Sequence, residues 1–399
     1  MVLQEEFQVE QFMDKYETDI KYNMGETCVD SLSIKDLTEL VDPRDAKNVQ
    51  QQLSKAVLET KLTYGCIQGS ERLRKAISKI YNDDYKGGEN PNPVEPTDLV
   101  ITNGAIGGNF LLFYTLVDPE DHVIIVDPSY QQLSSVPNVF SSGNATKFPM
   151  NFEDGYRPNL EKLSNLMAER KTKLLVINNP NNPTGVVWEN QVLEKIIDIC
   201  RKHDAYILCD EVYRPLYHSV EPGPKSIVNF GYEKAISTGS TSKAFSFAGL
   251  RLGWIACQNP GLVKNLLCKR DYNTISVSMI DDILATFVLD NYKTILERNY
   301  QLCRDNLKLI EDFVDESQGK VAWVKPQGGT TCFLKFTNPN IDTFNMSTDL
   351  AENHGLLIIP GETFYNKKGF IRVGFGNSRA SVEGGLAVLK QWLVKENLW

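Results

Sequence analysis

One stretch of the sequence sets a lysine among small, hydroxylated and apolar residues. The segment STSKAFSFAGLRLGW, residues 240–254, places Lys243 eight positions before Arg251 and spaces the run with glycines. Most lysines lie on the surface beside a turn, and that is the ordinary interpretation of such a residue. A chemical role for Lys243 requires that other polar groups of the chain reach the same place.

Polar side chains follow five apolar runs that are typical of β-strands. The segments just after these runs are residues 103–106, 128–130, 179–185, 210–213 and 239–243. In an open parallel sheet, ligands bind beyond the carboxyl ends of the strands. An aromatic ring, an amide, a carboxylate, a phenol, hydroxyl groups and the lysine are therefore expected at one edge of the sheet.

Each of these loops also has a purely structural interpretation. The segment TNGAIGGN, residues 102–109, fits neither the dinucleotide nor the ATP glycine fingerprint, and glycines between strand and helix are usually turns. The asparagines of residues 179–185 are ordinary turn formers, and Asp210 would serve equally well as a helix cap. Tyr130 and Tyr213 would ordinarily pack at a rim. A functional site is favoured because five separate loops present this chemistry together.

The strand-like runs alternate with helical patterns through the middle of the chain. Near-continuous apolar strands separated by helices predict a largely parallel sheet covered on both faces. After about residue 290 the pattern changes to a long helix, three strands and a final helix, which indicates a smaller α+β domain. We therefore expect an N-terminal arm (residues 1–47) packed on the small domain, a large domain (residues 48–290) and the small C-terminal domain (residues 291–399).

Composition narrows the classes of partner. The chain has 399 residues and a formal net charge of −9, which disfavours nucleic acid and anionic membranes because both repel an acidic surface. Its eight cysteines are scattered, which predicts buried free thiols in a reducing compartment, and its four histidines do not match zinc spacing. No metal site is expected. The acidic N-terminus has no apolar signal core and no stretch is long enough to span a bilayer, so a cytoplasmic location is expected.

Five motifs together resemble those of a known family. They are YGCIQGSERLR (64–74), NNPNNPTG (178–185), DEVY (210–213), STSKAFSFAGLRLGW (240–254) and FIRVGFG (370–376). With these motifs in this order, the chain resembles the fold-type I, pyridoxal-phosphate-dependent enzymes of the class I/II aminotransferase family. The resemblance implies an α/β fold whose large domain holds a mostly parallel, seven-stranded sheet between helices, with a smaller α+β domain after it.

The resemblance also implies roles for the residues that follow the strands. Lys243 would form the Schiff base with the aldehyde of pyridoxal 5'-phosphate and later act as the base at the substrate α-carbon. Asp210 would keep the pyridine nitrogen protonated. Tyr213 and Asn182 would bind the phenolic oxygen of the ring, and Tyr130 would stack on its face.

The cofactor phosphate and the substrate carboxylate need donors and positive charge. By the same resemblance the phosphate cup consists of Gly104, Ala105, Ile106, Ser240, Ser242 and Arg251. Gly249 and Gly253 would let the backbone pass close to the cofactor. Arg372, with Asn182 beside it, would bind the substrate α-carboxylate. Tyr64 would reach the phosphate of a neighbouring subunit, which implies a homodimer with shared active sites.

The N-terminal segment YNMGETCVDSL, residues 22–32, departs from the family pattern. Gly25 matches the glycine that lies over the substrate, but Glu26 follows it where a proline and an aromatic are common. No arginine matches the one that binds a distal carboxylate in some members. A buried carboxylate needs a cationic partner, so Glu26, with Asp30 after it, favours a substrate with a basic or polar side chain. Alternatively, Glu26 pairs with a lysine or caps a helix.

Three functional interpretations stay open on the sequence. The first is an aminotransferase that exchanges the amino group of an L-amino acid with a 2-oxo acid. The second is a lyase, cyclase or oxidase of the same fold, similar to capreomycidine synthases or arginine oxidases, acting on a basic or polar amino acid. The third is a non-catalytic binding module such as the cofactor-sensing half of a transcription regulator, which would carry a DNA-binding domain for which 399 residues leave no room.

Overall fold

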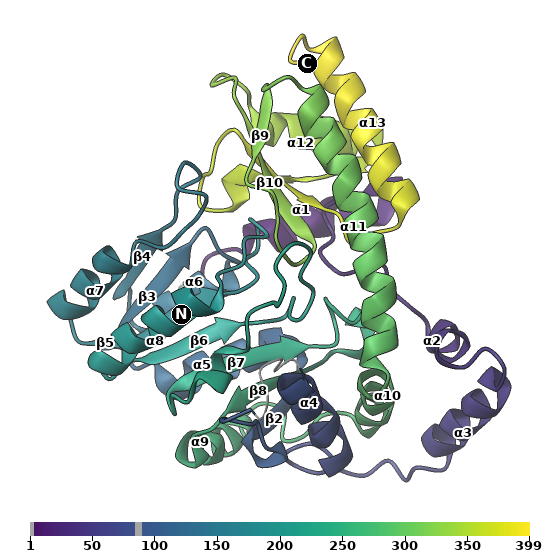
Figure 1. Ribbon diagram of the computed structural model, residues 1–399, viewed down its shortest axis with the longest axis vertical. Coiled ribbons are helices and arrows are strands. Elements are labelled where there is room, and N and C mark those ends of the chain that lie inside the picture. Colours follow the sequence, from purple (N-terminus) through teal and green to yellow (C-terminus); the bar gives the residue numbers. More distant parts are fainter. Residues whose placement is uncertain (1–3, 84–89) are drawn as a thin grey trace.

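A seven-stranded sheet forms the larger part of the molecule (Figure 1). The computed structural model describes residues 4–83 and 90–399; residues 1–3 of the expected arm and 84–89 of the expected large domain lie outside the described residues. The strands of this sheet are β2 (Leu99–Asn103), β3 (His122–Asp127), β4 (Ala145–Pro149), β5 (Thr172–Asn178), β6 (Tyr206–Asp210), β7 (Ala235–Ser240) and β8 (Leu252–Cys257). Their order is β2-β8-β7-β6-β5-β3-β4. β8 runs antiparallel to both of its neighbours and the other pairs are parallel, so the predicted mostly parallel α/β sheet is confirmed.

Helices cover both faces of this sheet because its strands are apolar on both sides. Successive residues of β5 belong to different cores: Leu174 and Val176 pack with the apolar side chains of α5 and α9, whereas Leu175 and Ile177 pack with those of α4, α7 and α8. This alternation is the two-residue period of a strand. The helices of this part are α3 (Ala46–Leu58), α4 (Glu71–Asp83), α5 (Gly104–Leu116), α6 (Gln132–Phe140), α7 (Leu160–Glu169), α8 (Asn190–Lys202), α9 (Pro260–Arg270) and α10 (Met279–Asp290).

A smaller antiparallel sheet follows in the chain and lies beside the first (Figure 1). Its order is β12-β13-β10-β9, from strands β9 (Val321–Trp323), β10 (Thr331–Phe336), β12 (Ile359–Pro360) and β13 (Phe370–Gly374). The long helix α11 (Tyr292–Glu316) runs alongside both parts. Two further helices, α12 (Thr343–His354) and α13 (Arg379–Lys395), complete this α+β unit.

The N-terminal segment packs between the two sheets rather than forming a separate unit. After helix α1 (Gln8–Tyr16), the short strand β1 (Tyr22–Asn23) pairs in parallel with β11 (Leu356–Leu357), a pairing that the sequence did not predict. The backbone N–H of Gly374 on β13 also donates to the carbonyl of Met24 at 2.7 Å. The chain then leaves through α2 (Ile34–Val41), which together with α3 extends to one side of the molecule (Figure 1).

The parallel strands end where this segment lies, so the loops after β2, β3, β5, β6 and β7 meet the N-terminal segment and β13 around one cavity. None of the helices formed by residues 4–83 and 90–399 combines the length and the apolar character needed to cross a bilayer. All eight cysteines carry free thiols, and six are buried, with Cys66 and Cys268 exposed.

Candidate active site

A cavity of about 390 Å³ lies beyond the carboxyl ends of the parallel strands. It collects side chains from the strand ends, from the start of α5, from α1 and the segment after β1, and from β13. Residues of the site predicted from the sequence that line this cavity are Glu26, Ala105, Ile106, Tyr130, Asn182, Asp210, Tyr213, Ser240, Ser242, Lys243, Arg251 and Arg372. The convergence predicted from the strand ends therefore exists in three dimensions.

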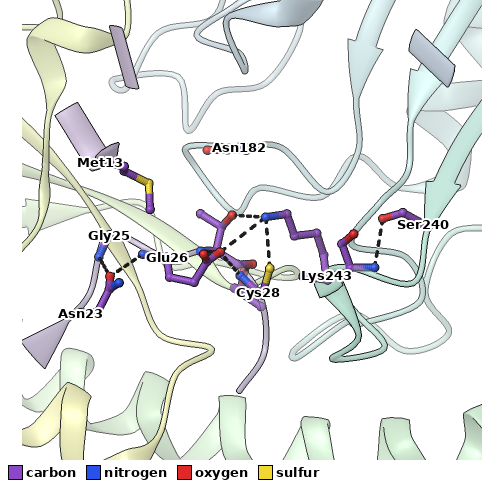
Figure 2. A network of polar contacts seen from close by, with 12 residues as sticks. Met13, Asn23, Gly25, Glu26, Cys28, Asn182, Ser240 and Lys243 are labelled. Atoms are coloured by element: carbon purple, nitrogen blue, oxygen red, sulfur yellow. Dashed lines mark hydrogen bonds and ion pairs between the residues drawn. The ribbon is translucent and has the colours of Figure 1, made fainter. Parts of the chain in front are cut away.

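Lys243 projects across the cavity toward the N-terminal segment (Figure 2). Its Nζ donates to Thr27 Oγ1 at 2.7 Å and to Cys28 Sγ at 3.4 Å, and it lies 3.6 Å from Glu26 Oε1. Burial favours the neutral amine, but the electrostatic influence of Cys28 and Glu26 outweighs it and raises the pKa of Lys243. A raised pKa keeps the amine cationic, and groups of the N-terminal segment hold it.

Glu26 is engaged within its own turn. Its Oε1 accepts the backbone N–H groups of Thr27 at 2.5 Å and Cys28 at 2.8 Å, close to Lys243 (Figure 2). Burial alone would raise the pKa of this carboxyl, but the Lys243 charge and the hydrogen bonds lower it to about 2. Glu26 is thus an ionised counter-ion of Lys243. A contact between Glu26 and substrate stays a prediction.

Asp30, the second acidic residue singled out in this segment, points elsewhere. Its carboxylate forms an ion pair with Arg298 on α11, with Oδ2 lying 2.8 Å from Nη2. The Arg298 Nη1 also donates to the Asp30 carbonyl at 2.8 Å. Asp30 therefore ties the N-terminal segment to α11, and it does not line the cavity among the described residues.

Asp210 is a buried carboxylate at the end of β6 with no ion pair to any cation in residues 4–83 and 90–399. Its Oδ2 accepts from Asn109 Nδ2 at 2.9 Å and its Oδ1 from the backbone N–H of Val212 at 3.2 Å. Asn109 is itself fixed by the hydroxyl of Thr238 at 2.8 Å. Burial is the main cause that raises the Asp210 pKa to about 6. A protonated ring nitrogen would supply the missing cation.

The start of α5 and the segment 240–253 form a cup suited to an anion. Gly104 begins α5 with φ +67°, and backbone N–H groups at a helix start bind phosphate readily. A Cβ on Gly253 would lie 2.3 Å from the Gly104 carbonyl carbon and 2.4 Å from the Ala105 nitrogen, so β8 touches this turn. No atom of the described residues lies within 4 Å of a Cβ on Gly249. That the backbone at Gly249 and Gly253 passes close to the cofactor stays a prediction.

Side chains complete the cup. Ser240 and Ser242 are buried at the end of β7, and the backbone N–H of Ser242 donates to Ser240 Oγ at 3.2 Å. The guanidinium of Arg251 donates through Nη1 to the carbonyl of Ala248 at 2.8 Å. A Cβ on Gly104 would sit 3.1 Å from Arg251 Nη2 and would press on the guanidinium, and the φ of +67° also favours glycine there.

Two tyrosines flank the cavity between Lys243 and the strand ends. Tyr130 donates its hydroxyl to Glu10 Oε1 at 2.9 Å, and its ring lies 5.0 Å from that of Phe7. Tyr213 is buried, and burial is the main cause that raises the pKa of its phenol. Both phenols are therefore neutral donors facing the site.

Arg372 on β13 is a guanidinium buried at 2 % exposure. Its Nη2 donates to the Gly25 carbonyl at 2.7 Å and its Nη1 to Asn182 Oδ1 at 3.3 Å, whereas its Nε has no partner. No carboxylate of the described chain forms an ion pair with it. A buried, uncompensated guanidinium is costly, and a carboxylate ligand in the fork of its donors would compensate it.

Tyr64 lies outside the cavity and is 75 % exposed. Within one chain, Tyr64 therefore lies apart from the other predicted site residues. The sequence missed other cavity residues, among them Glu10, Met13, Asp14, Glu17, Thr27, Cys28, Asn109 and Gln132. For Asn109, a polar residue within the apolar helix α5 was an available signal. For Glu10, Asp14 and Glu17, the signal was their helical spacing.

A half-buried lysine, an anion cup, a buried lone carboxylate and a buried guanidinium at the carboxyl edge of an α/β sheet are the features of an enzyme built for a phosphorylated aromatic cofactor. The family model of aminotransferase class I and II matches residues 32–389, and the chain belongs to this family. The enzyme is an aminotransferase, and its cofactor is pyridoxal 5'-phosphate.

Relatives cover most of the chain. A crystal structure of a PLP-dependent aminotransferase from Streptococcus suis 89-1591 is 34% identical with a TM-score of 0.87 and covers 98% of both chains. The capreomycidine synthase of Streptomyces vinaceus is 28% identical over 82% of this chain and 79% of its own. The aspartate aminotransferase of Thermotoga maritima is 29% identical over 78% of each chain.

The contact between Gly253 and the start of α5 leads to a prediction about the phosphate cup. In Gly253→Ala the new methyl group must push the Gly104–Ala105 turn away, so affinity for pyridoxal 5'-phosphate should fall about tenfold or more. Equilibrium dialysis of the apoenzyme against the cofactor measures this. Gly107→Ala is the matched control, because its methyl group would meet only Asn103 Cβ, at 3.8 Å, among the described residues, and Gly107 does not line the cavity. Equal affinity in both variants would contradict the packing explanation.

Proposed function

We propose that Lys243 is the residue to which the cofactor attaches and the base that moves the substrate α-proton. The observation that carries this proposal is that Asp210 and Arg372, both buried and both without an ion pair in the described chain, face the same cavity as Lys243. Each lacks a counter-charge that the cofactor ring or an amino acid would bring. The assignments below extend the proposal residue by residue.

The cofactor would be bound at three places. Gly104, Ala105 and Ile106 offer the N-terminus of α5 to the phosphate, and Ser240, Ser242 and Arg251 add hydroxyls and a positive charge. Asp210, kept in place by Asn109, holds the ring nitrogen as a cation. Tyr130 orients the ring from one face, and Tyr213 and Asn182 donate to its phenolic oxygen.

The substrate would be held by Arg372, with Asn182 and Gly25 fixing the orientation of the guanidinium. When bound, pyridoxal 5'-phosphate supplies an aromatic system that accepts the electron pair left when the amino acid loses its α-proton. Lys243 Nζ takes that proton and returns it, as the general base and acid of the reaction. Its cationic form in the free enzyme must first lose a proton, and Glu26 at 3.6 Å stabilises the charge until then.

We propose an L-amino acid and a 2-oxo acid as the substrates, since an aminotransferase exchanges an amino group between the two. Because the chain is similar to a capreomycidine synthase, we retain a second candidate function. It is that of a lyase, cyclase or oxidase of the same fold that acts on a basic or polar amino acid. Single-turnover reaction with one amino acid separates the two. Transamination leaves the cofactor in its amine form and releases a 2-oxo acid, whereas the other reactions regenerate the aldehyde form.

We propose a cytoplasmic homodimer and the division into residues 1–47, 48–290 and 291–399. A patch of exposed apolar side chains supports the dimer. Its members are Leu58, Leu62, Tyr64, Ile67, Tyr272 and Ile275. The two segments that carry them come together near Gly65, since a Cβ on Gly65 would lie 3.2 Å from Met279 at the start of α10. Tyr64 would reach the phosphate of the partner across this patch.

Replacement of Lys243 tests the attachment. Borohydride should fix the cofactor covalently on the wild-type chain, and peptide mass spectrometry should place the label at Lys243. In Lys243→Ala the label should vanish and amino transfer should slow by about a thousandfold or more, since a base within reach of the proton is lost. Lys264→Ala, which removes an exposed amine on α9, should keep both. A label on another lysine would refute the assignment.

Replacement of Asp210 tests the ring-nitrogen partner. Asp210→Asn nearly keeps the shape of the side chain but removes its charge and one of the two oxygens that accept hydrogen bonds from Asn109 and Val212. We expect exchange of the substrate α-proton for deuterium, followed by NMR, to slow about a hundredfold or more, which is the scale of losing one preorganised electrostatic partner. Asp118→Asn, an exposed acid at the end of α5, is the control. Ordinary exchange in Asp210→Asn would show that the charge acts elsewhere.

The dimer predicts a link between assembly and cofactor binding. Leu62→Asp puts a charge on the apolar patch, so sedimentation should shift from twice the mass of the chain toward the single chain, with cofactor affinity falling in parallel. Val394→Asp, at an exposed apolar position on α13, should alter neither. A wild-type chain that sediments as a monomer with full cofactor affinity would exclude the shared site.

A further inference from the structure

One face of the N-terminal helix forms a wall of the cavity. Val9, Glu10, Met13 and Asp14 of α1 line it, together with Glu17 in the 3₁₀ turn Glu17–Asp19 that follows. Positions separated by four and three residues lie on one side of a helix. The three carboxylates of Glu10, Asp14 and Glu17 are therefore aligned along the cavity. We call them the acidic face of α1.

This acidic face has no counter-charge among the residues that the structure describes. Like charges at i and i+4 destabilise a helix, and no lysine, arginine or histidine in residues 4–83 or 90–399 forms an ion pair with any of the three. Lys15, the basic residue beside Asp14, pairs with Glu352 instead. Burial, followed by the charges of Glu26, Asp14 and Glu10, raises the pKa of Glu17. The chain thus keeps a repulsive arrangement at a place where a ligand could relieve it.

The lining of the whole cavity also carries more negative than positive groups. Its described lining holds three cations and five carboxylates. The cations are Lys243, Arg251 and Arg372, and the carboxylates are Glu10, Asp14, Glu17, Glu26 and Asp210. Under the proposed function, Arg251 faces the phosphate, Arg372 faces the substrate carboxylate and Lys243 is taken up by the cofactor. No cation of the lining is left for the acidic face of α1.

The acidic face lies next to the position proposed for the substrate carboxylate. Met13, on the same side of α1, places its Sδ 3.9 Å from Arg372 Nη2, and Figure 2 shows it pointing toward Gly25 and Glu26. Arg372 is 2 % exposed and its Nε has no partner, which independently indicates a ligand at this end of the cavity. Asp14 is the next residue along α1, and Glu17 lies about one helical turn, or 5.4 Å, beyond Met13. A side chain running from Arg372 along α1 would meet these carboxylates.

We propose that the acidic face of α1 binds the cationic end of the substrate side chain, so that the substrates are L-amino acids with a distal guanidinium or ammonium group. The inference rests on the proposed function, since Arg372 must hold the α-carboxylate. A guanidinium fits best, because its planar fork of donors can bridge two carboxylates, whereas an ammonium is a single compact charge. An acidic side chain would meet repulsion here instead.

Pairs of charged and neutral amino acids of similar shape test the proposal. The holoenzyme should have a higher kcat/KM for L-arginine than for L-citrulline, and for L-lysine than for L-norleucine, by about tenfold or more. L-aspartate should be the poorest of the five. In the double variant Asp14→Asn/Glu17→Gln the arginine-to-citrulline ratio should fall about tenfold or more. Asp19→Asn, an exposed acid that does not line the cavity, is the matched control and should keep the wild-type ratio.

Binding without turnover separates this proposal from the role of Lys243. Calorimetry on Lys243→Ala should show tighter binding of L-arginine than of L-citrulline, and the preference should disappear when Asp14→Asn/Glu17→Gln is added. Equal effects of the double variant on both amino acids, or a wild-type enzyme indifferent to the distal charge, would overturn the proposal. If Lys243→Ala kept full turnover, the proposed function would fail while the charge preference could still be measured.

Discussion

The site depends on buried charges that have no ion-pair partner in the part of the chain that the structure describes. Asp210 and Arg372 are held by neutral partners, an amide for the one and a backbone carbonyl with an amide for the other. Each would be costly to bury alone, since an uncompensated charge in a low-dielectric interior loses its hydration. Folding therefore prepares two half-pairs, one negative and one positive, and under the proposed function cofactor and substrate would complete them.

The topology of the sheet is what brings these half-pairs together. Parallel strands β5, β6 and β7 end at the same edge, so residues far apart in sequence open onto one cavity. The antiparallel strand β8 returns beside them and presses Gly253 against the start of α5. The wall opposite comes from the N-terminal segment and β13, which are joined through Met24 and Gly374. The cavity is thus closed by segments from both ends of the chain.

The sequence was sufficient for those parts of the structure that local pattern controls. Continuous apolar runs predicted six of the strands of the large sheet, and residues placed directly after them were the ones that met in the cavity. β4 is only partly buried and alternates weakly, and β1 has two residues, so neither carries a pattern that stands out. Asn109, Cys28 and the acidic face of α1 were missed because their place depends on tertiary packing. Glu26 does have a cationic partner, as the sequence led us to expect, but this partner is Lys243 of the same chain.

The location of the acidic face explains why family membership does not by itself identify the substrate. The family model begins at residue 32, so α1, its following turn and Glu26 all precede the matched region. Within that region lie the lysine, the phosphate cup, Asp210 and Arg372, to which we assign the chemistry common to all amino acid substrates. Under our proposal, the distal part of the substrate would instead meet the cavity residues of α1 and its following turn. A relative named aspartate aminotransferase can then belong to the same family as a chain whose cavity is acidic at that end. The reaction and the side-chain preference would be encoded by separate segments, so that the second could change without altering the first.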